Sequence, residues 1–316
     1  MAGVTLANSR SHQRPERYRQ NMKKSLMKKI SWILFLSALV AFATGASPVW
    51  AKPALWKLSD PDTTICLFGT VHLLKAQTQW FDPDLKAAFE SSNELVVELV
   101  EPDPAEFNRV LLHRAVDADG PPLSSKLSSD DVQHYSKAMA DLGLSPHAFE
   151  QLKPWSIALL LTLIRIQILG YAPQHGVDKV LIQMARALDK SVVPLESPDD
   201  QLSILDELPE ADQIKWLQEV VRTLLEKDSS ITQIVQHWLA GDMNQLMKLF
   251  NQDMDQIPSL KSALMTNRNK RWTDWLVKRL DTPGTVFVAV GAAHLAGDDS
   301  VQTMLKGRKL SVERIR

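Results

Sequence analysis

The sequence predicts an α/β protein with a central, mainly parallel sheet and a large helical insertion in the middle of the chain. Two observations predict this class. Apolar runs rich in Val, Ile and Leu occur near both ends of the chain without alternating with polar residues, as in strands that helices cover on both faces. Between them, residues of about 104–280 have the apolar spacing of helices almost throughout. A single domain over residues 52–316 with this insertion is the simplest architecture.

The elements follow one another in a clear order. "LWKLS" and "TICLFGT" flank the turn-forming cluster "DPDT" at residues 60–63, which indicates a β-hairpin. The further predicted strands are residues 94–100, 191–197, 285–294 and 310–316. The clearest predicted helices are residues 82–92, 154–170 and 176–190. Residues 154–170 form the longest apolar run, but Arg165 and Gln167 interrupt it, so we expect a buried helix and no stable membrane insertion.

The first 51 residues have the layout of a cleaved secretory signal peptide. From Met22, four lysines precede a compact apolar stretch at residues 32–43, and small residues follow. We expect cleavage after Ala51, with Ala46 as the second choice and a retained membrane anchor as the alternative. Residues before Met22 lack any apolar pattern, which favours Met22 as the true start. The predicted location is periplasmic or secreted, as in bacteria.

Charge and cysteine content exclude further classes. Residues 52–316 carry 28 Lys and Arg against 36 Asp and Glu, without a basic stripe, so we expect no nucleic-acid partner. Cys66 is the only cysteine and rules out an intrachain disulfide. Its position within an apolar run indicates a small buried side chain.

Two copies of the pattern Gly-x-x-His end predicted strands at opposite ends of the chain. They are Gly69 to His72 and Gly291 to His294. A glycine at a strand end allows close backbone approach, and the carboxyl edge of an open α/β sheet is where ligands bind. One such histidine is more often a hydrogen-bonded structural residue, whereas the duplication favours function.

Two carboxylates fall in comparable places. Glu98 interrupts the apolar run at 94–100, and Glu196 follows the run near residue 192. An ionised group there is costly unless it is paired or binds a metal. Two histidines with one or two glutamates suit Zn²⁺, Mn²⁺, Fe²⁺ or Co²⁺, and one glutamate could instead activate water as a general base.

Other polar residues have simpler interpretations from pattern alone. His175 and Asp178 sit at a predicted helix start, where a turn residue and a carboxylate near the helix dipole are expected. Arg268 and Asn269 would ordinarily lie on a solvated helix face. An alternative interpretation of Glu98 and Glu196 is that each forms a structural ion pair.

The motifs "LFGTVHLL", "ELVVELVEPD", "VPLESPDD", "NRNKRW" and "VAVGAAHLAGDD" resemble those of the TraB/PrgY/GumN family over about residues 54–316. That family is related to TIKI metalloproteases and more distantly to erythromycin esterase-like and ChaN-like proteins. The resemblance implies a sheet built from two similar halves with the site between them. It also implies a metal-dependent hydrolytic centre in which His72, Glu98 and His294 hold a divalent ion. Glu196, Arg268 and Asn269 fall on further motif positions and join the catalytic candidates.

The predicted function is therefore an exported, metal-dependent hydrolase, most simply a peptidase, acting on a peptide or small molecule. Two alternatives stay open: a non-catalytic protein that binds a peptide or haem-like ligand, and a metal-independent esterase with a histidine as base. The sequence contains neither an HExxH helix nor a GxSxG elbow, so conventional zincin and serine-hydrolase mechanisms are not predicted.

Overall fold

The computed structural model describes residues 51–100, 103–227 and 229–316. The predicted signal peptide and its second-choice cleavage site lie outside these residues, apart from Ala51. By backbone contacts the chain divides into residues 1–49 and 50–316, and the fold below belongs to the second unit.

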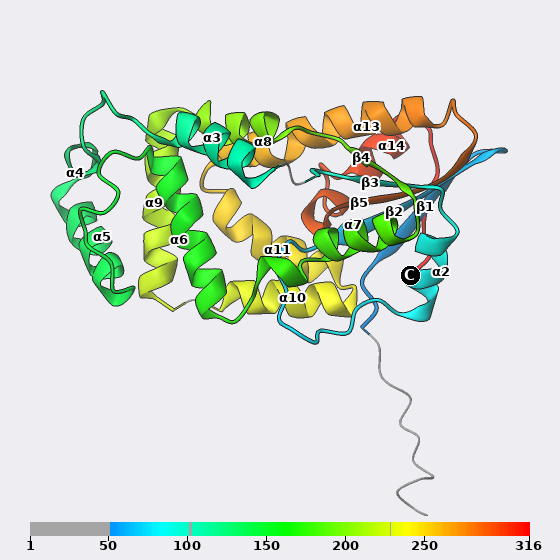
Figure 1. Ribbon diagram of the computed structural model, residues 1–316, viewed down its shortest axis with the longest axis horizontal. Helices are drawn as coiled ribbons and strands as arrows, with labels where there is room; N and C mark the ends of the chain where they lie inside the picture. The colour runs from blue at the N-terminus through cyan, green and yellow to red at the C-terminus, as the bar shows by residue number, and fades with distance from the viewer. Residues whose placement is uncertain (1–50, 101–102, 228) are drawn as a thin grey trace, which may run out of the picture. The chain divides into compact units, whose positions relative to one another are not determined.

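A mixed, mostly parallel six-stranded sheet forms the centre of this unit (Figure 1). Its strands are β1 (Leu55–Ser59), β2 (Thr63–Thr70), β3 (Glu94–Val97), β4 (Ser191–Pro194), β5 (Gly284–Gly291) and β6 (Val312–Arg314). Their order in space is β4-β3-β5-β2-β1-β6. The four strands from β4 to β2 are parallel, whereas β1 pairs antiparallel with both β2 and β6. The predicted α/β class is confirmed.

Helices fill the chain between the strands. They are α2 (Pro83–Glu90), α3 (Pro104–Ala115), α4 (Leu123–Lys126), α5 (Ser129–Asp141), α6 (Pro154–Ile168), α7 (Val177–Ala187), α8 (Pro198–Asp206), α9 (Glu210–Leu225), α10 (Ser230–Ala240), α11 (Met243–Met254), α12 (Pro258–Lys261), α13 (Asn267–Arg279) and α14 (Val301–Gly307). The described residues also form two short 3-10 segments, η1 (Pro173–His175) and η3 (Ala292–Leu295), and a π-helical turn, η2 (Ser262–Thr266).

The buried side chains form separate cores. The largest joins the sheet to α2, α7, α10, α11, α13 and α14, with Phe68, Phe287 and Trp238 among its fully buried aromatics. A second core packs α5, α6 and α9 together, and these helices lie away from the sheet in Figure 1. No helix in the described part of the chain is long and apolar enough to cross a membrane.

The four strands predicted after the hairpin all end earlier than the apolar pattern indicates, and His294 lies beyond β5. β3 ends at Val97 and β4 at Pro194, so Glu98 and Glu196 follow their strands and do not interrupt them. The segments that follow β3 and β4 stay side by side beyond the two strand ends, because the N–H of Glu196 donates to the carbonyl of Glu98 at 2.9 Å. Both carboxylates therefore start from the same edge of the sheet.

Candidate functional site

The carboxyl ends of β2, β3, β4 and β5 meet at one edge of the sheet, where ligands bind in open α/β folds. His72 follows β2, and Glu98 and Glu196 follow β3 and β4. His294 lies in η3, directly after β5. The parallel pairing thus brings together four side chains that are far apart in the sequence.

The two motif glycines permit this assembly. A Cβ on Gly69 would lie 2.9 Å from the Cα of Ala292, so only glycine lets the end of β2 approach the second motif. A Cβ on Gly291 would lie 3.0 Å from Glu98 Oε1, 3.4 Å from His294 Cδ2 and 3.9 Å from His72 Nε2. The two rings therefore approach each other well within the ~10 Å that one shared ion would tolerate.

Asp178 holds His72 in place. The N–H of Val177 donates to the carbonyl of Val71 at 3.0 Å, which docks the start of α7 on the segment after β2. Asp178, in the first turn of that helix, then reaches His72 Nδ1 with its Oδ2 at 2.8 Å. The hydroxyl of Thr70 donates to the other oxygen of the same carboxylate. Thr70, Asp178 and His72 form a hydrogen-bonded chain that leaves His72 Nε2 without a protein partner among the described residues.

The Asp178 carboxylate raises the pKa of His72 to about 9, with a smaller contribution from Glu98. His72 is therefore an imidazolium at neutral pH. Its side chain is 61 % exposed, so water screens the ion pair and limits its contribution to folding stability to under ~1 kcal/mol.

His294 has the opposite environment. The ring is buried, and its Nδ1 lies 2.6 Å from the side-chain oxygen of Asn269. The amide nitrogen of Asn269 donates to the carbonyl of Asp299, so its oxygen faces the ring and Nδ1 carries the proton. Burial, with the nearby Arg268 cation, lowers the pKa of His294 to about 3, so the ring is neutral at neutral pH.

Arg268 is buried at the centre of the site, and all five of its N–H donors have acceptors. Nη1 donates to the carbonyl of Leu264 at 3.3 Å and faces His294 Nε2 at 3.2 Å. Nη2 donates to Glu98 at 2.5 Å and to Glu196 at 2.7 Å, and Nε also donates to Glu196. The guanidinium therefore locks both carboxylates and one histidine in place.

Both glutamates accept hydrogen bonds from this guanidinium. Burial alone would raise the pKa of Glu98, but Arg268 and the two histidines hold it well below the usual range. Its Oε1 accepts from the N–H of Gly291 at 2.5 Å. Glu196 also accepts from Arg271, whose side chain is 53 % exposed. The structural ion pair considered for both glutamates is thus present.

The predicted metal ligands lie together, but they do not fit an ion as the side chains are arranged here. Arg268 faces His294 Nε2, while both oxygens of Glu98 accept hydrogen bonds. Among the described residues, no group of three or more His, Cys, Asp or Glu side chains is placed to hold a metal ion. A metal at His72, Glu98 and His294 stays a prediction.

Three residues have partners in the site that their local sequence pattern does not indicate. Asp178 has the position of a dipole-stabilising carboxylate, and only the docking of α7 on the His72 segment shows its partner. Arg268 and Asn269 have the composition of a surface helix, yet they are 6 % and 1 % exposed. The π-helical turn directly before α13 is a feature frequent at functional sites, but the sequence does not reveal it.

Two hollows flank His72, which lines both. One, of about 450 Å³, also contacts Glu98 and Asp178. The other, of about 380 Å³, contacts Arg268 and His294 and is otherwise mainly apolar. The unpaired ring nitrogen of His72 thus lies where a bound molecule could reach it.

Comparison with known proteins gives a family and relatives. The model of the TraB/PrgY/gumN family matches residues 54–314. The chain is 31 % identical over 185 residues to the uncharacterised protein YbaP of Escherichia coli K12, covering 58 % of this chain and 68 % of YbaP. It is 20 % identical over 297 residues to an uncharacterised protein of Treponema pallidum, covering 87 % and 88 % of the two chains. No solved structure matches significantly.

Proposed function

The chain belongs to the TraB/PrgY/gumN family, and from this premise and the site geometry we propose that it is a hydrolase of amide bonds in peptides, with His72 as the general base. The observation that carries the proposal is the hydrogen-bonded chain from Thr70 through Asp178 to His72. It orients the imidazole and leaves Nε2 without a partner among the described residues, on a ring that lines both hollows. A nucleophile or base held by a third group is the usual pattern of hydrolytic sites.

His72 is the best proton acceptor of the cluster. Glu98 and His294 have lowered pKa values and hold protons weakly, whereas the pKa of His72 is raised to about 9. In the proposed reaction, neutral His72 takes a proton from water through Nε2, and the oxygen attacks the substrate carbonyl. The resulting imidazolium then returns the proton to the leaving amine.

Glu98 orients the water. Its Oε1 lies on the same side of Gly291 as His72 Nε2, and Arg268 prevents the carboxylate from turning away. Arg268 and Asn269 act as positioning residues, since their hydrogen bonds go to Glu98, Glu196 and His294. Because only the neutral form of His72 is a base, the rate should rise with pH up to about 9.

Metal dependence and export remain predictions from the sequence. A divalent ion would supply a Lewis acid at the same edge of the sheet, but it would first need Glu98 and His294 to leave Arg268. Periplasmic or secreted location is supported by the signal-like first 51 residues. Intact mass of the exported protein, with an N-terminus at Lys52 or Ser47, tests it, and an uncleaved cytoplasmic species as the sole form contradicts it.

The deciding experiment is cleavage of a peptide library by the purified protein between pH 6 and 10, with and without chelator, alongside elemental analysis. We expect cleavage that rises with pH, survives the chelator and is lost in His72→Gln. Cleavage that stops with the chelator and returns with added metal supports the metal-dependent centre. Peptide binding without turnover at any pH overturns the hydrolase in favour of a binding protein.

A further inference from the structure

Two helices form one apolar wall of the 380 Å³ hollow beside His72. Ile231 and Ile234 project from α10, and Leu246 and Phe250 project from α11. The spacings of three and four residues place each pair on one helix face. This wall is therefore built by the α10–α11 pair, and the ends of β2 and β5 line the same hollow.

The polar side chains at its inner end have little left to offer a polar ligand. Arg268 has an acceptor for every N–H, and both nitrogens of His294 have partners. The hydroxyl of Thr70 donates to Asp178. Among these four side chains only His72 Nε2 remains uncommitted, and apart from Tyr171 the other residues that line the hollow are apolar. The rest of this hollow therefore recognises hydrocarbon better than it recognises hydrogen-bonding groups.

Several of its apolar side chains stay in contact with water. Ile231, Ile234 and Phe250 are only partly buried, although the two isoleucines pack against the main core. Covering them with a ligand would remove this apolar surface from water, which is favourable. A concave, mostly apolar hollow with a few polar groups at one end is the usual form of a ligand site.

We propose that this hollow binds a hydrocarbon group of the substrate next to the bond that His72 attacks. The group is either a large aliphatic or aromatic side chain of a peptide or an acyl chain. The assignment of a cleaved bond rests on the proposed function, whereas binding of the hydrocarbon does not. The second hollow, which contains Leu99, Gln183 and Arg186, holds the rest of the substrate on the other side of His72.

Binding is measured without turnover, with uncharged methyl ketones from 2-butanone to 2-decanone as probes. These carry a carbonyl but no bond to hydrolyse. Calorimetry on the full protein should show affinity rising about fourfold for each added methylene until the hollow is filled, from ~0.8 kcal/mol per buried CH₂. Equal affinity along the series overturns the proposal.

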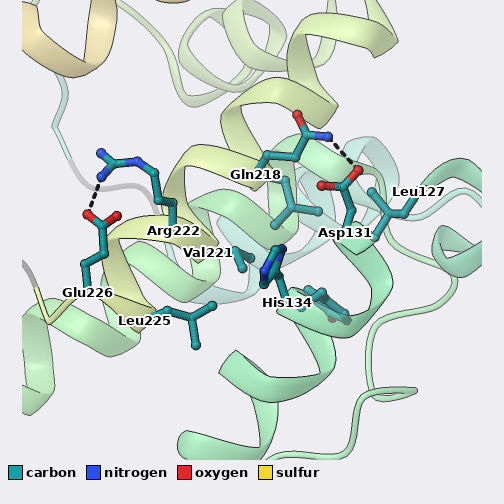
Figure 2. A pocket seen from close by; sticks show the side chains of 10 residues that line it. Leu127, Asp131, His134, Gln218, Val221, Arg222, Leu225 and Glu226 are labelled. Atoms are coloured by element: carbon teal, nitrogen blue, oxygen red, sulfur yellow. Dashed lines mark hydrogen bonds and ion pairs between the residues drawn. The ribbon is translucent and has the colours of Figure 1, made fainter. Parts of the chain in front are cut away.

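Two variants place the binding. Ile234→Trp fills the hollow and should weaken 2-octanone at least tenfold. Phe250→Ala enlarges it and should move the best ketone to a longer chain, which keeps the test decisive if the tryptophan variant does not fold. The matched control is Leu225→Trp, in the hollow of the helical region where Figure 2 shows Leu225 beside Val221. The Leu225→Trp protein should bind 2-octanone as tightly as the parent. If it loses as much affinity as Ile234→Trp, the ketone does not bind in the hollow beside His72.

Cleavage then separates the two substrate sources. Peptides with Ala, Leu or Phe at one position are compared with N-octanoyl glycinamide. A preference of tenfold or more for Leu or Phe supports a peptide side chain, and hydrolysis of the octanoyl compound supports an acyl chain. Ketone binding that depends on chain length, without any cleavage, supports the hydrocarbon site and contradicts the proposed hydrolase. Cleavage without any preference for apolar groups supports the hydrolase and contradicts the hydrocarbon site.

Discussion

His72 and His294 occupy the same place in the same short motif, after neighbouring parallel strands, yet they have opposite charge states at neutral pH. His72 is 61 % exposed and pairs with the Asp178 carboxylate, which makes it a cation. His294 is 3 % exposed, and its burial, with the nearby Arg268 guanidinium, lowers its pKa and keeps it neutral. The strands position both rings equally well, so the difference comes from the helices packed against them.

This difference separates the two histidines by role. α7 brings a carboxylate to the first motif, and α13 brings an arginine and an asparagine to the second. The first ring keeps one nitrogen for a bound molecule, while the second uses both nitrogens within the protein. A duplicated motif therefore need not make two equal ligands, and variants at the helical partners should show the asymmetry most clearly.

Removing Arg268 should have the largest effect. Arg268→Ala leaves Glu98 and Glu196 buried without their cation and should lower the free energy of unfolding by ~3–5 kcal/mol. Arg271→Ala is the matched control, because it removes an exposed arginine from the same Glu196 and should cost no more than ~1 kcal/mol. Denaturant titration compares them, and equal losses would show that Arg268 is not the central counter-ion.

The two histidines should respond differently to substitution. His72→Gln removes the proposed base and should lower kcat by ~10²–10⁴-fold with little change in stability, because the side chain is exposed. His294→Gln should destabilise the fold, since it disturbs buried hydrogen bonds to Arg268 and Asn269.

Kinetics and denaturant unfolding on both proteins separate these effects. His134→Gln, an exposed histidine in the helical region, is the control and should change neither quantity. A stable His72→Gln variant with parental activity would remove His72 from the reaction.

The glycines of the two motifs should matter for assembly. Gly69→Ala places a Cβ 2.9 Å from the backbone of Ala292 and should cost ~1–3 kcal/mol of stability through overpacking. Gly307→Ala is the control, because it has open space around it and an ordinary backbone conformation. Thermal unfolding measures both, and a neutral Gly69→Ala would mean that the strands do not need this close approach.

The sequence predicted the framework better than the site. Strand ends and the two Gly-x-x-His motifs are local patterns, so residues 64–70 and 285–294 pointed to one sheet edge. The partners of the histidines could not be predicted, because Asp178 lies 106 residues from His72 and looks like a helix-dipole carboxylate. The burial of Arg268 was missed for a similar reason: its neighbours "NRNKRW" are polar, and only the tertiary packing of α13 shows which side faces the sheet.

Asp178→Asn should change the free energy of unfolding least of these variants. It should change the pH dependence of the rate most. His72 has a raised pKa in the folded protein, so its ion pair stabilises the fold fully below about 6.5 and is lost as the pH rises through about 9. The substitution removes the charge that raises this pKa, so the NMR titration of His72 should move towards 6.5. The rising limb of the rate against pH should shift in parallel, because the neutral ring becomes available at lower pH. Stability at pH 6 should fall by under ~1 kcal/mol, since water screens the pair. If the limb stays near pH 9 while the titration of His72 moves, another group is the base.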